Sequence, residues 1–364
     1  MKNTSIWLIC SVALLFSFGL LMVFNTTSAE ILERTMEGST HAPLFRQFLY
    51  GTIGIGAGIF AYFLGYDFLL KNSHILLCLA ICMLILLYIP GLGQTINGSR
   101  RWLGFAGFSF QPSECIKILV PLVYIRWYMA QTQVQFKDFL QILGFLMIPI
   151  TLILFQPDHG TTAILFSLLI VLFFLTKIRL AYWALPLLLV MGAGVWGAYR
   201  LPYVQSRIQV YLHPELDLRG KGHQPHQAKI AAGSGKLFGR GLGESLQKLN
   251  YLPEARSDYI AAIYAEEMGF FGILGLIAVY LTLTFSGVAI AMRARDQAGY
   301  LIASILTFLI SIQAFLNLGI VSGLLPSKGT TLPFFSQGGS SLVVNLIAFF
   351  LILGVSRKHE RAEV

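Results

Sequence analysis

The chain has 364 residues, of which 56% are hydrophobic and only 12% are charged, and its formal net charge at pH 7 is +9. A soluble domain carries roughly 25% charged residues, so this composition excludes an ordinary soluble enzyme and indicates an integral membrane protein. Apolar runs of helix-spanning length favour transmembrane helices over a β-barrel, whose strands alternate in segments of about ten residues. We therefore expect an all-α membrane protein.

Hydrophobic runs predict ten transmembrane helices. They lie near residues 6–24, 46–65, 74–90, 113–130, 139–155, 161–177, 181–199, 258–292, 299–323 and 338–356. The first run exceeds the roughly 7–15 apolar residues of a signal-peptide core, so we interpret it as a helix. The eighth exceeds the roughly 20 residues of a simple crossing, and we expect its first turns to stand above the bilayer or the helix to tilt. Residues 1–364 then form one polytopic membrane domain.

Lysine and arginine residues place both termini in the cytoplasm, because short cytoplasmic segments carry an excess of them. Lys2 and Arg357 lie at the two predicted cytoplasmic ends. Residues 200–257, between the seventh and eighth helices, form a long outer loop with nine basic and four acidic residues. Long loops escape the charge rule. The excess positive charge indicates an anionic partner at the outer face, either lipid headgroups or a phosphorylated substrate.

Asp258 stands where the outer loop meets an apolar helix. A carboxylate is costly at the mouth of a membrane span, so its presence there indicates a functional group. Glu266 and Glu267 follow about 12–14 Å further along the helix at 1.5 Å per residue, so neither forms a tight carboxylate pair with Asp258. For at least one of them we expect a structural role, packed against backbone or cations of neighbouring helices.

Further polar residues open predicted helices. Glu114 and Lys117 are three residues apart and can pair on one helical face, either as a functional pair or as a self-neutralised pair that tolerates burial. Asp158 precedes the sixth helix and can cap its free N–H groups. The cysteines lie in apolar stretches without a neighbouring histidine, so we expect small buried side chains and no metal site. They are Cys10, Cys78, Cys82 and Cys115.

Two segments are rich in glycine. Gly239–Gly243 has alternating glycines, but no strand precedes it, so a nucleotide-binding interpretation is weak, and a close backbone approach to a surface or phosphate is the alternative. We expect the outer loop to be too glycine-rich to hold itself still. Residues 323–341 are too rich in polar residues, glycine and proline to cross as a helix, so we expect them to line a cavity or form a re-entrant loop. Lys328 offers this loop a charge for a phosphate.

Five motifs occur in the order found in one family. They are Asn97–Leu103 with Gln111–Glu114, Gln156–Thr162, Leu252–Asp258, Ala265–Gly269 and Gly323–Leu342. The chain resembles the SEDS peptidoglycan polymerases, the family of the division protein FtsW and the elongation protein RodA. The resemblance runs from the first to the tenth predicted helix. Leu252–Ala255 and Lys328 favour the division type, with the elongation type as the alternative.

The resemblance implies an inverting hexosyltransferase of the cytoplasmic (inner) membrane. Such enzymes polymerise lipid II at the outer face through β-1,4 bonds and release undecaprenyl diphosphate. Implied partners are lipid II, the undecaprenyl-diphosphate-linked glycan, a single-pass class B penicillin-binding protein that crosslinks the product, other division proteins and membrane lipids, but no nucleic acid. The resemblance makes Asp258 the catalytic residue. The candidate substrate-binding residues are Arg100, Arg101, Glu114, Lys117, Asp158, Arg207, Lys328 and Ser340.

The chemistry of this reaction agrees with these residues. An attacking sugar hydroxyl needs a base, and a positioned carboxylate typically contributes about 10²–10⁴-fold. The diphosphate leaving group needs stabilised negative charge, which basic side chains or a divalent cation, Mg²⁺ or Mn²⁺, can supply, although the sequence specifies no cofactor. Two positions depart from the family pattern, since Gln337 replaces a usual Tyr and His159 a usual apolar residue. A lipid II flippase without a base and a scaffold that activates a crosslinking enzyme remain alternatives.

Overall fold

The computed structural model describes residues 2–34, 41–89, 91, 93–96, 99–105, 108–200, 205, 222–249, 252–326 and 329–360. The helices in these residues are α1 (Lys2–Arg34), α2 (Ala42–Leu64), α3 (Tyr66–Leu86), α4 (Pro112–Met129), α5 (Phe136–Phe155), α6 (His159–Leu175), α7 (Leu180–Arg200), α9 (His223–Ser234), α10 (Ile260–Met292), α11 (Gln297–Val321) and α12 (Gly339–Glu360). Each predicted span overlaps one of them, and α9 falls in the predicted outer loop.

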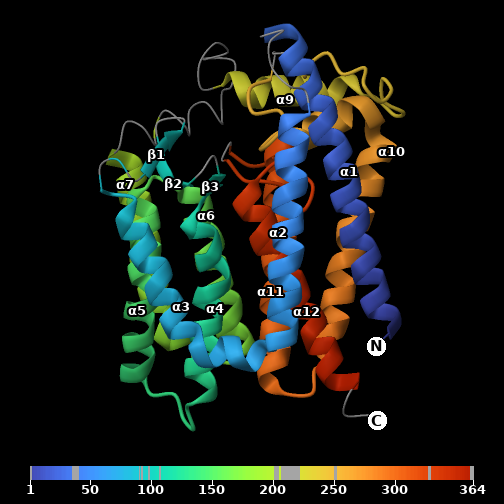
Figure 1. Ribbon diagram of the computed structural model, residues 1–364. Coiled ribbons are helices and arrows are strands. Elements are labelled where there is room, and N and C mark those ends of the chain that lie inside the picture. Colours follow the sequence, from blue (N-terminus) through green and yellow to red (C-terminus); the bar gives the residue numbers. More distant parts are fainter. Residues whose placement is uncertain are drawn as a thin grey trace.

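The long helices lie side by side as a bundle (Figure 1). Among the described residues, α1, α2, α3, α5, α10, α11 and α12 are long and apolar enough to cross a membrane, whereas α6 and the first part of α7 are shorter apolar helices. This confirms a multi-pass helical membrane protein. Figure 1 also places both ends of the chain at one end of the bundle, with α9 and a small sheet at the other.

The helical fold class is confirmed, but the described residues between 93 and 110 include three short strands that the sequence did not predict. Strands β1 (Gly93–Ile96), β2 (Ser99–Phe105) and β3 (Phe108–Phe110) form an antiparallel sheet in the order β1-β2-β3. Gln94 lies opposite Trp102, and Leu103 lies opposite Phe110. The segment is too short for a further crossing, and strand pairing satisfies its backbone groups at the end of the bundle. Because β2 contacts α4 and β3 contacts α12, the sheet is held over the helix ends.

Helix α10 is broken inside the predicted eighth span. Gly269 has φ 67° and ψ −165°, which interrupts the helix after its first nine residues, Ile260–Met268. A straight helix of 33 residues would be about 50 Å long, well beyond a hydrocarbon core of about 30 Å. The first turns are therefore a separate part of this helix, and a positive φ at the break favours glycine. That they stand above the bilayer, or that the helix tilts, stays a prediction.

The glycine-rich part of the predicted outer loop is packed against this break. The N–H groups of Arg240 and Gly241 donate to the carbonyls of Glu266 and Glu267 at 3.0 and 3.1 Å. A Cβ atom at Gly239 would lie only 2.0 Å from the Glu267 carbonyl oxygen. The expectation of a loop that does not hold itself still is wrong for this segment, because its glycines permit close backbone packing. A close approach of this backbone to a protein surface, here that of α10, was the alternative that the sequence analysis left open.

The cysteines are not buried as expected. Cys10, Cys78 and Cys82 are exposed on α1 and α3, and Cys115 is half-buried. An apolar side chain in a membrane protein is stable when it faces lipid as well as when it faces protein, so hydrophobicity alone did not distinguish the two positions.

Candidate functional site

Asp258 lies in the turn that leads into α10, two residues before the helix begins, and its side chain is half-buried. The amide of Asn317, from the last turns of α11, holds this turn. It donates to the backbone carbonyl of Asp258 at 2.8 Å and to that of Thr330 at 2.6 Å. Asn317 is 1% exposed. One buried side chain therefore joins the Asp258 turn to the loop between α11 and α12.

That loop is not helical in the residues described, as its composition predicted. It is anchored from several sides, because Gln47 on α2 donates to the Ser336 carbonyl at 3.0 Å and Tyr280 on α10 donates to the Pro333 carbonyl at 2.6 Å. Its beginning lies against the candidate catalytic group, and a Cβ atom at Gly329 would be 2.9 Å from Oδ2 of Asp258. Irregular backbone in a membrane protein is stable where protein groups satisfy it, as they do here.

Asp158 and Arg101 approach the same loop from the other half of the bundle. Asp158 caps α6, as predicted, and accepts from the Thr161 N–H at 3.2 Å and from the Thr161 hydroxyl at 3.0 Å. Arg101 on β2 donates to the Gln156 and Pro157 carbonyls at 3.0 and 2.7 Å, and its Nη1 lies 3.8 Å from Oδ1 of Asp158. The charge of Arg101 is thus fixed beside the start of α6.

The two groups of residues meet at Gly160. A Cβ atom there would lie 3.4 Å from the Thr330 methyl group and 3.7 Å from the Gly329 carbonyl oxygen. Asp158, Arg101 and Asp258 are therefore close enough to influence one another electrostatically. The pKa of the Asp258 carboxyl is raised from 3.8 to about 7, chiefly by burial and also by the negative charges of Glu254 and Asp158, while the positive charge of Arg101 lowers it. A carboxyl group with this pKa can exchange a proton near neutral pH.

Ser340, near the start of α12, has a structural position between three elements. Its hydroxyl accepts from the Gln111 N–H at 2.9 Å and donates to the Ser109 carbonyl at 3.4 Å. The Gln111 side chain in turn donates to Asp158 at 3.3 Å. Ser340 therefore supports the residue that contacts Asp158, and its substrate contact stays a prediction.

Glu114 and Lys117 form the predicted ion pair, with 2.6 Å between Oε2 and Nζ. Both side chains are buried in the bundle, and Lys117 also donates to Gln313 on α11 at 3.4 Å. Buried amides and hydroxyls continue from there, through Gln313, Asn345, Ser341 and Thr331, to the loop beside Asp258. The predicted pairing is confirmed, and its two interpretations, a functional pair and a self-neutralised pair that tolerates burial, both stay open.

Glu266 and Glu267 have the structural role expected for at least one of them. Glu267 pairs with Lys248 at 3.0 Å and accepts from Asn25 on α1 at 2.6 Å. Glu266 accepts from the Ser245 hydroxyl at 2.5 Å and from two backbone N–H groups. These contacts hold the predicted outer loop against α10 and α1. One of the nine basic residues of that loop, Lys248, is therefore buried in an ion pair.

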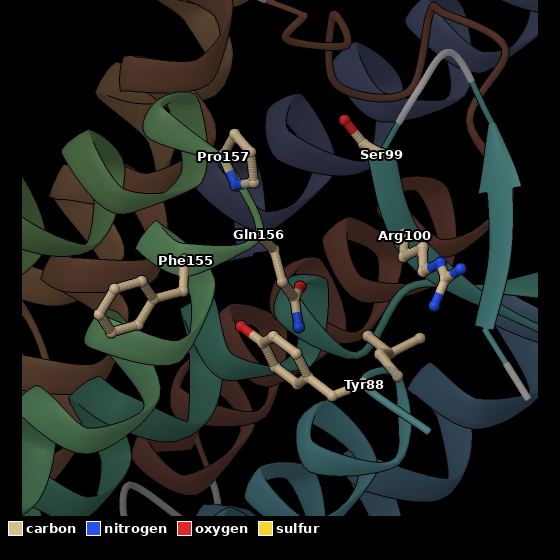
Figure 2. Close-up of a pocket in the computed structure, with 7 residues that line it drawn as sticks. Tyr88, Ser99, Arg100, Phe155, Gln156 and Pro157 are labelled. Atoms are coloured by element: carbon tan, nitrogen blue, oxygen red, sulfur yellow. The ribbon is translucent and has the colours of Figure 1, made fainter. Parts of the chain in front are cut away.

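Arg100 is exposed. It lines a cavity of about 210 Å³ with Leu87, Tyr88, Ser99, Phe155, Gln156 and Pro157 (Figure 2). This cavity adjoins the Asp158 group, because the Gln156 and Pro157 carbonyls also accept from Arg101. Two other predicted substrate-binding residues, Arg207 and Lys328, lie outside the described residues. Within the part of the chain that is described, no three His, Cys, Asp or Glu side chains gather closely enough to hold a metal ion.

Asn317 is the site residue that the sequence analysis missed. A side-chain amide inside an otherwise apolar helix is costly unless it finds partners, and this was the available signal. The pattern alone did not show which of several buried amides reaches the Asp258 turn.

Comparisons with known proteins agree with this architecture. A family model described as "Cell cycle protein", which covers FtsW, RodA and SpoVE, matches residues 5–361. The chain is 38% identical over 360 residues to a probable peptidoglycan glycosyltransferase FtsW from Nitrosomonas europaea, covering 96% of this chain and 91% of the relative. It is 35% identical over 362 residues to the stage V sporulation protein E of Bacillus subtilis, covering 98% of each.

Solved structures have the same fold. One is from work on the structural coordination of polymerization and crosslinking by a peptidoglycan synthase complex. Its TM-score is 0.78, its sequence identity is 23%, and the match covers 97% of both chains. Another is the rod shape determining protein RodA of Thermus thermophilus, with a TM-score of 0.67, 24% identity and coverage of 97% of this chain and 96% of the other.

Proposed function

This chain belongs to the FtsW/RodA/SpoVE family of cell cycle proteins, and we propose that it is a peptidoglycan glycosyltransferase that polymerises lipid II during cell division. The relatives named as probable FtsW glycosyltransferases support the activity and the division role. The observation that carries the proposal is the Asp258 carboxyl, which is held at the mouth of the bundle and has a pKa raised to about 7.

In the proposed reaction Asp258 acts as the general base. Its carboxylate takes the proton from the sugar hydroxyl of the acceptor while that oxygen attacks the anomeric carbon of the donor. The bond between this carbon and the diphosphate breaks, and undecaprenyl diphosphate leaves with the electron pair. A base of this kind is most efficient when its pKa lies near the working pH, and the pKa of Asp258 meets that condition.

Arg101 is the described cation best placed to act on the leaving diphosphate. Its guanidinium is fixed by two backbone carbonyls and lies 3.8 Å from Asp158. A positive charge that is already oriented stabilises developing negative charge without reorganisation during the reaction. Arg207 and Lys328 are further proposed phosphate ligands, and a divalent cation is the alternative source of charge.

We propose ten membrane crossings, made by α1 to α7 and α10 to α12, in the cytoplasmic membrane. Both termini then lie in the cytoplasm, and α9, the sheet and the 200–257 loop lie outside. The positions of Lys2 and Arg357 support this orientation through the positive-inside rule. It places Asp258 at the outer surface, where a lipid-linked sugar is accessible from the membrane.

A single-pass class B penicillin-binding protein is the proposed partner. The similar fold in a synthase complex that coordinates polymerization with crosslinking supports it. Such a partner would pack on lipid-facing helices and reach the outer loop. Because Glu266 and Glu267 tie that loop to the helix that follows Asp258, a partner bound there can bias the geometry of the base.

The test is polymerisation of purified lipid II by the purified chain, with and without its transpeptidase partner, followed by gel separation of glycan strands. We expect strands in both reactions and more of them with the partner. No strands in either reaction, together with lipid II translocation in vesicles, would instead identify a flippase. If the partner alone makes glycan strands and this chain alone makes none, the chain would instead be a scaffold.

A further inference from the structure

The chain between α9 and α10 folds back onto the break in α10. We name residues 235–249 the clamped segment, because backbone hydrogen bonds hold it there. The Phe270 N–H donates to the Lys236 carbonyl at 2.9 Å, and the Phe271 N–H donates to the Leu237 carbonyl at 3.2 Å. This part of the molecule lies at the end of the bundle that carries α9 (Figure 1). The hydrogen bonds fix the clamped segment relative to the long second part of α10.

The clamped segment has polar side chains inside and apolar side chains outside. Ser245 and Lys248 are buried, since they contact Glu266 and Glu267. The large apolar side chains are half or more exposed, namely Leu237 (56%), Phe238 (80%), Leu242 (51%) and Leu246 (50%). Water disfavours this arrangement, because the removal of apolar surface from water is the main force that folds a soluble chain. Lipid favours it, because buried polar groups need protein partners and apolar groups do not.

The exposed apolar side chains of the clamped segment continue a surface of α10. The ring centroids of Phe238 and Phe271 are 5.3 Å apart. Phe270, Phe271 and Leu274, in the first turns after the break, are themselves at least half exposed. Since α10 is long and apolar enough to cross a membrane, an exposed apolar face of this helix is a lipid-facing surface. The clamped segment extends that surface sideways.

The length of α10 indicates how deep this surface lies. Phe270–Met292 is about 34 Å long at about 1.5 Å per residue, and a hydrocarbon core is about 30 Å thick. The exposed cations Arg293 and Arg295 follow directly and mark one headgroup region. Phe270 then lies at the opposite boundary of the hydrocarbon. The clamped segment lies at the same level, because its backbone is bonded to Phe270 and Phe271.

Two cations flank the exposed apolar residues of the clamped segment. Lys236 precedes Leu237 and Phe238, and Arg240 follows them, and both cations are exposed. Segments that lie in a membrane interface combine Phe and Leu at the acyl-chain boundary with Lys and Arg among the headgroups. The clamped segment has this combination at the depth where it is effective.

We propose that the clamped segment is an interfacial anchor. It inserts Phe238 and the neighbouring leucines into the lipid of one leaflet, with Lys236 and Arg240 among the phospholipid headgroups. Lipid covers this surface also when a transpeptidase partner is bound. The anchor fixes the height of the first part of α10, to which Glu266 and Glu267 tie it. The proposal rests on the membrane crossing of α10 and not on the activity proposed for Asp258.

The test measures the depth of single nitroxide labels on the full chain in phospholipid nanodiscs, after the four native cysteines are replaced by alanine. The labelled variants are Phe238→Cys and Leu242→Cys. Leu281→Cys, an exposed position roughly 16 Å along α10 from Phe270, is the hydrocarbon control. Thr132→Cys, an exposed position in the turn between α4 and α5, is the water control. Collisions of each label with oxygen, which concentrates in hydrocarbon, are compared with collisions with a water-soluble nickel chelate.

We expect the ratio of oxygen to nickel collisions in Phe238→Cys and Leu242→Cys to exceed that in Thr132→Cys about threefold or more, because interfacial segments lie roughly 5–10 Å into the boundary. The ratio should stay below that in Leu281→Cys and should not change when the class B penicillin-binding protein is added.

Ratios in Phe238→Cys and Leu242→Cys equal to that in Thr132→Cys would show that water covers the clamped segment, which would overturn the proposal. Loss of oxygen collisions in both variants on addition of the partner would assign the surface to that protein and would overturn it as well. Lipid II is absent from the measurement, so the result is independent of whether the chain polymerises it.

Discussion

The side-chain amide of Asn317 donates a hydrogen bond of 2.8 Å to the backbone carbonyl of Asp258. The same nitrogen donates to Thr330 at 2.6 Å, while the Asn317 side-chain oxygen has no hydrogen-bond partner among the described residues. A buried amide that is satisfied only in part is costly, so its position indicates a role. That role is to hold the candidate base against the loop between α11 and α12.

We expect Asn317→Leu to lower the polymerisation rate about tenfold or more. The substitution removes both donors and leaves two carbonyls unpaired, at a cost of about 1–3 kcal/mol for each buried group. Initial rates with purified lipid II provide the measurement. Ser322→Ala is the control, because Ser322 lies at the end of the same helix and its hydroxyl donates only locally, to Gly319. Equal rates in Asn317→Leu and wild type would contradict the positioning role.

Gly329→Ala should impair activity while leaving stability nearly unchanged. The new Cβ atom would meet Oδ2 of Asp258 at 2.9 Å, and this carboxylate is the flexible end of a side chain that can move aside. Movement of the base is harmful to catalysis, since small displacements of a reacting group lower the rate strongly. Gly275→Ala on α10 is the control, because a Cβ atom there has no neighbour within 4 Å. A fall in melting temperature that accounts for the lost activity would argue against this explanation.

The pH dependence of the rate should follow the charges around Asp258. Because the base must be ionised, the rate should rise as pH increases through about 7, the pKa of this carboxyl in the folded protein, which is raised chiefly by burial. Glu254 raises that pKa and Arg101 lowers it. Glu254→Gln should therefore move the midpoint to lower pH, and Arg101→Gln should move it to higher pH. The comparison concerns midpoints of kcat/KM profiles, not maximal rates, and shifts in the same direction would refute the assignment.

The ion pair between Lys248 and Glu267 should contribute strongly to the stability of the outer loop. Their side chains are 6% and 0% exposed. Removing one partner of such a pair leaves a buried charge and costs about 3–5 kcal/mol. Lys248→Met should therefore lower the unfolding temperature in detergent, and the double variant Lys248→Met/Glu267→Leu should recover part of the loss. Asp67→Asn is the control, since Asp67 is 66% exposed and surface pairs contribute about 1 kcal/mol or less.

The helices could be predicted from the sequence because membrane crossing is mostly a local property of length and hydropathy. The overlap of α5 with the predicted span 139–155 is an example. The sheet at residues 93–110 was missed, since its strands gain stability from pairing and from contact with α4 and α12. The early start of α3 at Tyr66 was missed for a similar reason. Its first residue, Tyr66, donates to Asp296 at 2.7 Å, a contact between segments that are distant in the sequence.

The candidate site was predictable where a charge interrupts apolar sequence. Asp258 and Asp158 were both identified in this way, and the cap formed by Asp158 followed from its position before α6. The supporting role of Ser340 was not predictable. It depends on how α12 meets the sheet, which is a relation between distant segments.

The most direct test of the central claim is the polymerisation rate of Asp258→Asn compared with wild type. The amide has the shape of the carboxyl group but cannot accept the proton of the attacking hydroxyl. We predict a loss of about 10²–10⁴-fold, the usual contribution of a general base. An unchanged thermal unfolding curve would show that the fold is intact. Wild-type rates of glycan-strand synthesis by a folded Asp258→Asn protein would contradict the assignment of Asp258 as the base.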